Sequence, residues 1–225
     1  KNSFFQMYRD VSIQLEDNKL IIKIDDMYKK TIQDSAIKQS LEIVRKRIDE
    51  SGTKEPLIQR SGKKRILLQL PGVKDPERIK ELLGKTAKLT FHLVDDENTS
   101  ALNANIAPFG KMIVNDIYDD NIKYLLNKRS LVGGENLVDA KGSFDQTEGH
   151  AVSFRFDTEG AQKFGKITSD NVGNRLAVVL DGVVITAPRI NSPITGGSGI
   201  ITGNFNAQDA SDLAVLLRAG ALPAP

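Results

Sequence analysis

The N-terminal third of the chain switches between strand-like and helix-like spacing of apolar residues. Alternation over 11–15 and 19–24 predicts two strands joined by a turn at Glu16-Asp-Asn18. Helical spacing then predicts a helix over 36–51, with Asp34 or Ser35 as its cap and Gly52 just past its end. The apolar stripe of this helix is formed by Ile37, Leu41, Val44 and Ile48.

Two more strands and a second helix complete a unit of known order. Strands are predicted over 56–60 and 65–70, and Pro71-Gly72 stops the second. A helix opens at Asp75-Pro76, where an N-cap precedes a first-turn proline, and closes at Gly84. Alternation over 87–94 predicts a further strand. The order β-α-β-β-α-β is that of a ferredoxin-like unit.

The pattern weakens between residues 95 and 149 and then returns. In the weak stretch, 124–127 reads as a short strand or a turn of helix. Asp181-Gly182 between two β-branched runs predicts a tight hairpin, because both positions of such a turn favour positive φ. The remaining elements are a strand over 151–156, a helix over 158–171, a strand near 199–202 and a helix over 207–218 capped by Asn206. Together these patterns predict an α+β protein with a second α+β unit.

Composition narrows the class of protein. The net charge is +2, from 31 basic and 29 acidic residues, so the chain lacks the electrostatic field of a nucleic-acid-binding protein. No apolar run is long enough to span a bilayer, and the absence of cysteine excludes disulfides and thiol chemistry. Because the chain starts without methionine and ends in the extended run Leu222-Pro-Ala-Pro225, we expect a segment of a longer protein.

No set of residues points to catalysis, a metal or a cofactor. Gly84-Lys-Thr86 lacks the spacing of a phosphate-binding loop, and Ser198 lacks the frame of a nucleophile elbow. His92 falls on the polar side of a strand, which predicts a surface or interface position. The acidic clusters 95–97 and 116–120 lack the ligand spacing of a calcium loop. We therefore expect no enzyme activity, no metal and no cofactor.

Two surfaces keep alternative interpretations. The basic runs Arg45-Lys-Arg47 and Lys63-Lys-Arg65 are typical of solvated faces, or of a face toward anionic lipid. A second set of apolar residues reads most simply as core, but part of it would also suit a groove for unfolded polypeptide. That set is Phe154, Phe156, Phe164, Val178, Leu180, Val183 and Ile185.

Short blocks near the C-terminus occur in a fixed order at close spacing. They are Leu180-Asp-Gly182, an apolar run ending in Ala187-Pro188, Ile194-Thr-Gly-Gly-Ser198, Ile201-Thr-Gly-Asn-Phe205, an Ala/Leu helix and Arg218-Ala-Gly-Ala-Leu-Pro-Ala-Pro225. In these blocks the chain resembles the large extracytoplasmic domain of the SecD family of protein-export subunits. The upstream runs 47–52, 66–73 and 82–94 extend the resemblance, which is weakest over 98–149.

The resemblance implies a ferredoxin-like base over 1–96 plus 206–225 and an inserted α+β head over 97–205. It also implies a periplasmic domain at the bacterial inner membrane, anchored by flanking membrane helices absent from this chain. Its partners would be SecF, the SecY channel complex and unfolded exported precursors, with no nucleic acid. The parent protein would use the proton-motive force to assist translocation. A passive periplasmic binding or scaffold module is the alternative.

Two groups of residues are candidates for that function. We expect precursor contact at Leu180, Ile185 and the loop residues Thr195, Gly196 and Gly197, where extended peptide meets an apolar surface and bare backbone. We expect the head to pivot on the base through two crossover segments, near 95–98 and 203–205, because a hinge needs residues that tolerate changes in φ and ψ. The hinge candidates are Asp95, Asp96, Gly203 and Asn204.

Overall fold

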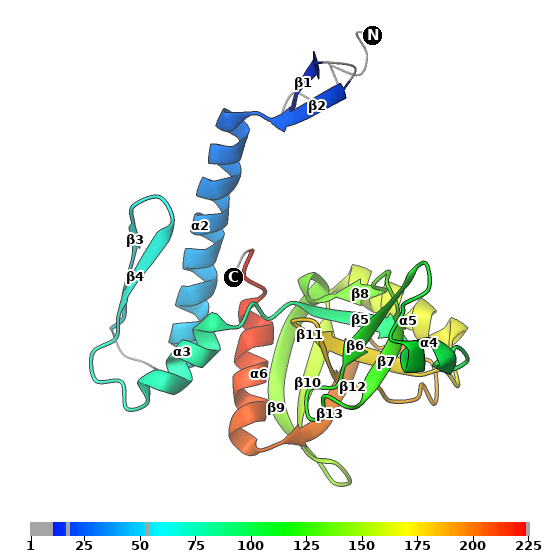
Figure 1. Cartoon of the computed structure of the whole chain (residues 1–225). Coiled ribbons are helices and arrows are strands. Elements are labelled where there is room, and N and C mark those ends of the chain that lie inside the picture. The colour runs from blue at the N-terminus through cyan, green and yellow to red at the C-terminus, as the bar shows by residue number, and fades with distance from the viewer. Residues whose placement is uncertain (1–10, 17–18, 53–54, 224–225) are drawn as a thin grey trace.

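The chain folds into two lobes of unequal size joined side by side (Figure 1). The computed structural model describes residues 11–16, 19–52 and 55–223. We call residues 11–84 the N-terminal lobe and residues 87–220 the C-terminal lobe. Both combine helices with antiparallel strands, so the predicted α+β class is confirmed.

Two hairpins and two helices make up the N-terminal lobe. The hairpin of β1 (Val11–Glu16) and β2 (Lys19–Ile24) stands at the far end of the long helix α2 (Asp26–Glu50). Part of the turn predicted between these strands, residues 17–18, lies outside the described residues. A second hairpin, β3 (Leu57–Ser61) and β4 (Arg65–Gln69), lies along α2. Helix α3 (Pro76–Gly84) begins as predicted, with the Asp75 side chain accepting a hydrogen bond from the Arg78 N–H.

Helix α2 begins ten residues earlier than its apolar stripe predicts. Its N-cap is Asp25, whose carboxylate accepts hydrogen bonds from the backbone N–H groups of Met27 and Tyr28. The first turns were missed because they pack against little: Met27 is 78% exposed and Ile32 is 48% exposed. Hydrophobic periodicity marks only helix faces that are buried, and here burial starts near Ile43.

The C-terminal lobe contains two main sheets, a separate hairpin and three α-helices. The strands of one sheet lie in the order β12-β11-β5-β8, those of the other in the order β13-β10-β9, and β6 pairs with β7. The strands are β5 (Leu89–Leu93), β6 (Lys111–Asn115), β7 (Lys123–Asn127), β8 (Val132–Gly133), β9 (Leu137–Asp145), β10 (Gly149–Phe156), β11 (Leu176–Leu180), β12 (Val183–Thr186) and β13 (Ser198–Phe205). The helices are α4 (Thr99–Ala104), α5 (Thr158–Asp170) and α6 (Ala207–Ala219), with a 3-10 turn, η1 (Gly134–Asn136).

The β-α-β-β-α-β order is present along the chain, but its strands pair in different sheets. β3 pairs only with β4 among the described strands, whereas β5 lies between β11 and β8. Strand β5 contributes Leu89 and Phe91, each 1% exposed, to the larger core. A strand buried to this extent needs apolar cover that the thin N-terminal lobe does not supply.

The predicted turns agree with the structure, whereas several strands in the stretch 95–149 were missed. The β11–β12 hairpin turns at Asp181-Gly182, with φ of 50° and 86°, as predicted. The stretch 124–127 is a strand, β7. Its partner β6 and the nine-residue strand β9 were missed. In β9 the outward Asp139 and Lys141 and the central Gly142 hide the alternation.

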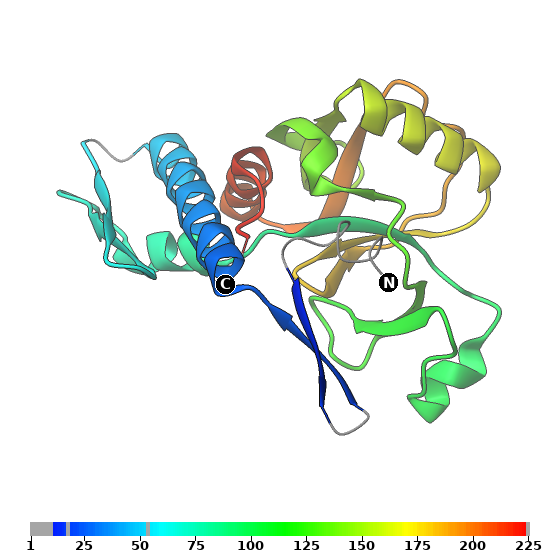
Figure 2. The same ribbon diagram turned by 90° about the horizontal axis from the view of Figure 1, so that it is seen from above.

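Helix α6 connects the two lobes. Its apolar side packs on β9 and β10 and belongs to the larger core, while its other side contacts α2. Both views place it between α2 and the sheets of the C-terminal lobe (Figures 1 and 2). The helix starts with the predicted capping box, in which Asn206 and Asp209 exchange side-chain and backbone hydrogen bonds.

Candidate functional site

Four phenylalanine rings form the centre of the C-terminal lobe. Phe91 comes from β5, Phe154 and Phe156 come from β10, and Phe164 comes from α5, with ring centroids 5.1–6.1 Å apart. The rings meet in edge-to-face and tilted arrangements, which are favourable for aromatic pairs. These contacts fix β10, β5 and α5 relative to one another. The core interpretation of Phe154, Phe156 and Phe164 is confirmed.

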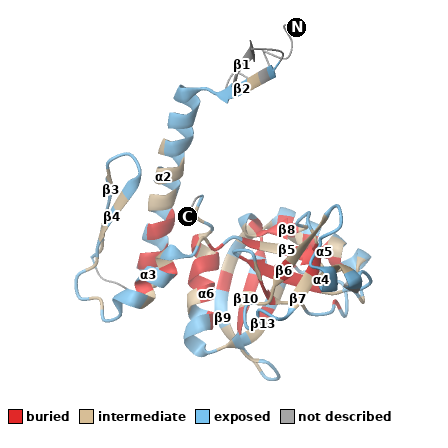
Figure 3. Ribbon diagram, viewed as in Figure 1, coloured by how far each residue is buried: buried red, intermediate tan, exposed pale blue. Residues whose placement is uncertain are grey.

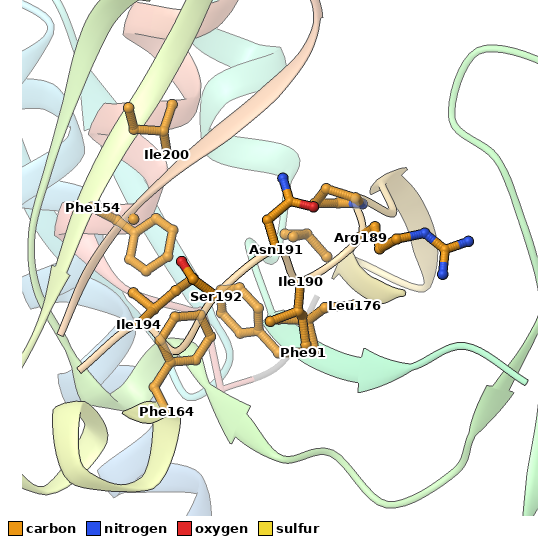
Figure 4. A pocket seen from close by; sticks show the side chains of 13 residues that line it. Phe91, Phe154, Phe164, Leu176, Arg189, Ile190, Asn191, Ser192, Ile194 and Ile200 are labelled. Atoms are coloured by element: carbon orange, nitrogen blue, oxygen red, sulfur yellow. The ribbon is translucent and has the colours of Figure 1, made fainter. Parts of the chain in front are cut away.

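A cavity of about 260 Å³ opens beside three of these rings. Its floor is Phe91, Phe154, Phe164, Leu176 and Val178, and its rim is the segment 188–194 together with Gly199 and Ile200 of β13. Figure 4 shows the rings turned toward the cavity, whereas the Arg189 guanidinium points away from it. The walls are mainly apolar, with the polar rim side chains Asn191 and Ser192.

The rim segment is held against α5 by small residues and one buried hydroxyl. The Thr168 Oγ1 donates to the Phe164 carbonyl at 2.8 Å and accepts from the Ile194 N–H at 2.8 Å. Gly197 has φ of +68°, and a Cβ there would lie 2.4 Å from the Cβ of Ala161. The close approach needs glycine. The bend at Gly197 also lets its carbonyl accept a hydrogen bond from the Phe156 N–H at 2.8 Å.

The mouth of the cavity continues into a shallow groove on the outer face of the β13-β10-β9 sheet. Both hollows share Phe154, Ile194, Gly199 and Ile200. A Cβ at Gly199 would lie 2.6 Å from the Phe154 ring, so glycine there lets the ring reach the edge strand. Ile200 is 54% exposed at this junction. The groove encloses about 630 Å³ and is lined on its polar side by Asp139, Lys141, Ser153, Arg155 and Ser198.

The residues predicted to contact a precursor fall into two places. Thr195 and Gly196 are exposed and Gly197 is buried in the loop that follows the rim segment, and none of the three lines the cavity. Leu180 and Ile185 are 7% and 3% exposed. These two side chains line a different cleft, of about 190 Å³, with Tyr118 and α6. Precursor contact by these five residues stays a prediction.

Most of the residues that line the cavity were missed from the sequence. Phe91, Ile190 and Ile200 come from distant segments, and only the fold brings them together. The sequence did contain one indication of Ile200. Neighbouring residues of a strand point to opposite faces, and Ile201 belongs to the core, so Ile200 lies on the outward face. Single exposed apolar residues are common on protein surfaces, so this signal alone did not identify the site.

The four hinge candidates all lie in the C-terminal lobe. Asp95 follows β5, where its N–H donates to the Leu125 carbonyl at 2.8 Å and its carboxylate pairs with Lys111 at 2.7 Å. Hydrogen bonds from Lys111 and Asn98 lower the pKa of Asp95 to about 2. Asp96 pairs with Arg175 at 3.2 Å.

The other two candidates, Gly203 and Asn204, lie within β13, and a Cβ on Gly203 would lie 3.0 Å from the Phe205 ring. A hinge at these four residues stays a prediction.

His92 is a structural residue and not the surface or interface residue expected. It is 4% exposed, with Nδ1 2.8 Å from the Asn127 carbonyl and Nε2 2.9 Å from the Thr90 hydroxyl. The expectation failed because both faces of β5 are covered. Burial lowers the pKa of His92, which favours the neutral ring. Arg47 is a second correction, because it is 0% exposed and belongs to no solvated or lipid-facing surface.

Two further kinds of site were sought in the part of the chain that the structure describes. In the described residues, no three His, Asp or Glu side chains gather where they would hold a metal ion. No helix in the same part of the chain is both long and apolar enough to cross a bilayer. An open apolar cavity with a few polar groups on its rim is the usual form of a ligand-binding site. The fold and the site thus define an α+β domain with a candidate binding cavity.

Comparison with known proteins places this domain in a family. The model of the N-terminal part of the P1 domain of the protein translocase subunit SecDF matches residues 37–96, and the model of the SecDF P1 head subdomain matches residues 111–224. The chain belongs to the SecD family, and the resemblance noted in its sequence is confirmed. Residues 97–110, which include α4, lie between the two matches.

Individual relatives agree with this assignment. Protein translocase subunit SecD of Rickettsia bellii is 44% identical over 218 residues, which cover 96% of this chain and 42% of the relative. A solved structure of SecDF, described as a membrane component that enhances protein export, has a TM-score of 0.68 and 35% identity over 85% of this chain and 90% of its own. A crystal structure of SecDF in a super-membrane-facing form has a TM-score of 0.70 and 34% identity, over 85% of this chain and 27% of its own. The chain spans less than half the length of the curated relatives it matches.

Proposed function

We propose that this chain is the P1 domain of a SecD subunit at the periplasmic face of a bacterial inner membrane, where it contacts unfolded precursor proteins during export. The observation that carries the proposal is the open apolar cavity beside an edge strand, in a chain that belongs to the SecD family. The parent protein would act with SecF and the SecY channel complex, and would draw on the proton-motive force. The domain itself would bind and position the precursor without a chemical step.

The cavity suits a ligand of variable sequence. Its apolar floor can accept different apolar side chains, because the hydrophobic effect is non-directional. Strand β13 forms one edge of its sheet, so an extended segment can add backbone hydrogen bonds beside Gly199 and Ile200. The groove that continues from the mouth carries both Lys141 and Asp139, and so tolerates polar segments of either charge. This combination favours an unfolded polypeptide over a small metabolite.

The proposal includes movement of the head against the base. A precursor held by the head would advance, or be kept from sliding back, when the head turns relative to the base. Interfaces between domains that are polar in character permit such motion. The predicted pivot at 95–98 and 203–205 would be tested by engineered disulfide crosslinks across those segments, with undiminished export arguing against it.

Site-specific photocrosslinking to a stalled precursor in membranes tests precursor contact. Photoreactive residues at Ile200 and Thr195 report on the mouth and on the loop that follows the rim segment, whereas Leu180 and Ile185 are too buried to carry a bulky probe. Val172, 48% exposed at the end of α5, and Glu42, exposed on α2, serve as matched controls. We expect crosslinks at Ile200 and Thr195, only during translocation.

Two results would contradict precursor contact. Equal crosslinking from all four positions would mean unspecific collision. No crosslinks, with export still dependent on the parent protein, would mean that the domain acts on SecY or SecF instead. The alternative of a passive periplasmic scaffold predicts no crosslinks and unchanged export when the cavity is filled by Gly199→Phe.

A further inference from the structure

The chain crosses between the two lobes twice, and the two crossings touch. The first crossing, residues 85–88, leads from α3 to β5, and the second, residues 220–222, returns from α6. Leu222 packs against the small core of the N-terminal lobe and its N–H donates to the Thr86 carbonyl at 2.8 Å. Any rotation of one lobe on the other must pass through this pair of segments.

Arg47 reaches both crossings from α2. Its Nη1 donates to the carbonyls of Leu82 at 2.9 Å and Lys85 at 2.6 Å. Its Nη2 donates to the carbonyls of Thr86 at 3.3 Å and Gly220 at 3.2 Å. The guanidinium therefore joins α2, the C-terminal end of α3, the outgoing crossing and the incoming crossing.

The acceptors explain why a buried cation is tolerated there. The last carbonyls of a helix have no partner within the helix and carry the negative end of its dipole. Leu82 is one of these residues in α3. Burial lowers the pKa of Arg47 to about 10, so the side chain keeps its charge at neutral pH. A planar fork with several donors suits acceptors from three segments, whereas a lysine offers only a compact point charge.

Asp181 holds the same crossing from the C-terminal lobe. Its carboxylate accepts hydrogen bonds from the Thr86 hydroxyl, from the Ala87 N–H at 2.9 Å and from the Lys88 N–H at 2.8 Å. Ala87 has φ of +60°, a backbone conformation that residues other than glycine rarely adopt. Side chains of both lobes thus bind the same short segment. Arg47 donates to the carbonyls of the segment, and Asp181 accepts from its N–H groups.

Beyond this segment, the lobes meet through charged pairs. Arg78 of α3 makes a bidentate contact with Asp212 of α6, with the shortest distance 2.6 Å. Arg218 of α6 pairs with Glu50 of α2 at 2.7 Å. Both pairs are partly exposed to water, which screens their charges, although the bidentate geometry of Arg78 and Asp212 does favour one orientation. The buried contacts of Arg47 are more selective in geometry.

We infer that Arg47 is the positioning residue that sets the orientation of the C-terminal lobe on the N-terminal lobe, through the main chain of both crossings. It acts at the place about which the lobes would turn. Arg45 and Lys46 are exposed on the same helix and do not share this role. The assignment holds whether or not the cavity binds a precursor, because it rests on contacts within the chain.

Distance measurements between spin labels test this inference. The chain has no native cysteine, so labels can be placed at Glu42 in α2 and Lys166 in α5, which are both exposed. A second pair, Lys141 and Lys166, lies within the C-terminal lobe and reports on its integrity. We expect one narrow distance for each pair in the unaltered chain.

The variants separate orientation from stability. Arg47→Met should broaden or shift the Glu42–Lys166 distance and leave the Lys141–Lys166 distance narrow, with Arg47→Lys intermediate. The matched control Arg45→Met should behave as the unaltered chain. Asp181→Asn replaces one accepting oxygen by an NH2 group, which weakens the contact from the other lobe, and should also broaden the distance between lobes.

Two outcomes would overturn the inference. One is an unchanged distance between the lobes in both Arg47→Met and Asp181→Asn. The other is equal broadening of both label pairs in Arg47→Lys and Asp181→Asn, which would make Arg47 a general stabiliser of the fold. Neither depends on crosslinking to a precursor, so failure here and failure of the proposed function are distinguishable.

Discussion

The two lobes are stabilised in different ways. The C-terminal lobe has one large apolar core, centred on the four phenylalanine rings and extended by the apolar side of α6. In the N-terminal lobe the buried apolar cluster consists of Val44, Ile48 and Ile79, with partly buried neighbours from β3, β4 and α3. Figure 3 shows the same contrast, with buried residues concentrated in the sheets and α6 and an exposed upper half of α2.

This difference predicts a division of labour. A lobe with a large, close-packed core has a fixed internal geometry and can hold a preformed cavity. A lobe with a small core depends on contacts outside itself, here with α6 and with the crossings at 85–88 and 220–222. We therefore expect the C-terminal lobe to be the more rigid of the two, and the N-terminal lobe to adapt to its neighbours.

The largest effect is expected in the core of the C-terminal lobe. Phe91→Ala removes the ring that touches Phe154, Phe156 and Phe164, and should lower the free energy of unfolding by about 3–5 kcal/mol. Denaturant unfolding followed by circular dichroism measures this loss. Phe109→Ala is the control, because this side chain is fully exposed and its removal should change stability by less than about 0.5 kcal/mol. Similar losses in the two variants would contradict a core centred on these rings.

A smaller and more local loss is expected in the N-terminal lobe. Ile48→Ala removes its most buried apolar side chain, at 0% exposure, and should cost about 2 kcal/mol. Hydrogen exchange should show lost protection in α2 and α3 while β5, β10 and β11 stay protected. Equal loss of protection in both lobes would mean that they unfold as one unit, and would remove the basis for the contrast.

Two neighbouring glycines test how the cavity rim is held. Gly197→Ala should cost about 1–3 kcal/mol, because φ is +68° and the new Cβ would overlap Ala161. Gly196→Ala is the matched control, since a Cβ there meets nothing within 4 Å. Thermal unfolding of both variants measures the difference, and Gly197→Ala should also weaken precursor crosslinking from Ile200. An unaltered melting temperature in Gly197→Ala would show that the segment shifts to make room for the Cβ without loss of stability.

Local chemistry made part of this fold readable from the sequence. The turn at Asp181-Gly182 and the helix start at Asp75-Pro76 depend on one or two residues and their own backbone. They can therefore be predicted without knowing what packs against them. Strand β9 and the start of α2 depend on what packs against them, and the sequence alone does not contain that information. For the cavity, the sequence indicated only that part of an apolar set, which includes Phe154, Phe164 and Val178, could form a groove. The full outline depends on how the fold joins β5, β10, β11 and α5, which no local pattern shows.

The burial of Arg47 could have been predicted from its position on the helix. It follows Val44 by three residues and precedes Ile48 by one, which puts it beside the buried stripe of α2 and not opposite it. Grouping it with Arg45 and Lys46 as a basic run ignored this helical position. Position on the helix, more than charge, separates the buried arginine from its exposed neighbours.

The smallest effect concerns an ion pair inside the C-terminal lobe, in contrast to the charged pairs between lobes. The pKa of Asp95 is about 2 in the folded chain, against about 3.9 for an unperturbed aspartate. A folded-state pKa below the unfolded value stabilises the fold above pH ~4, and this contribution is lost as the pH falls from about 4 to about 2. Lys111→Met removes the main cause of the lowered pKa and should flatten the acid-induced loss of stability in this window.

Denaturant midpoints measured from pH 2 to pH 7 check this expectation, with Lys128→Met as an exposed control on the same lobe. At pH 7 the Lys111→Met variant should be less stable than the unaltered chain by about 1 kcal/mol or less, since one side of the pair remains accessible to water. At pH 2 the two should converge, because Asp95 is then largely protonated in the unfolded state and half protonated in the folded state. Parallel curves across the whole range would show that the Lys111 pair does not contribute to the stability of the C-terminal lobe, and that its rigidity comes from apolar packing alone.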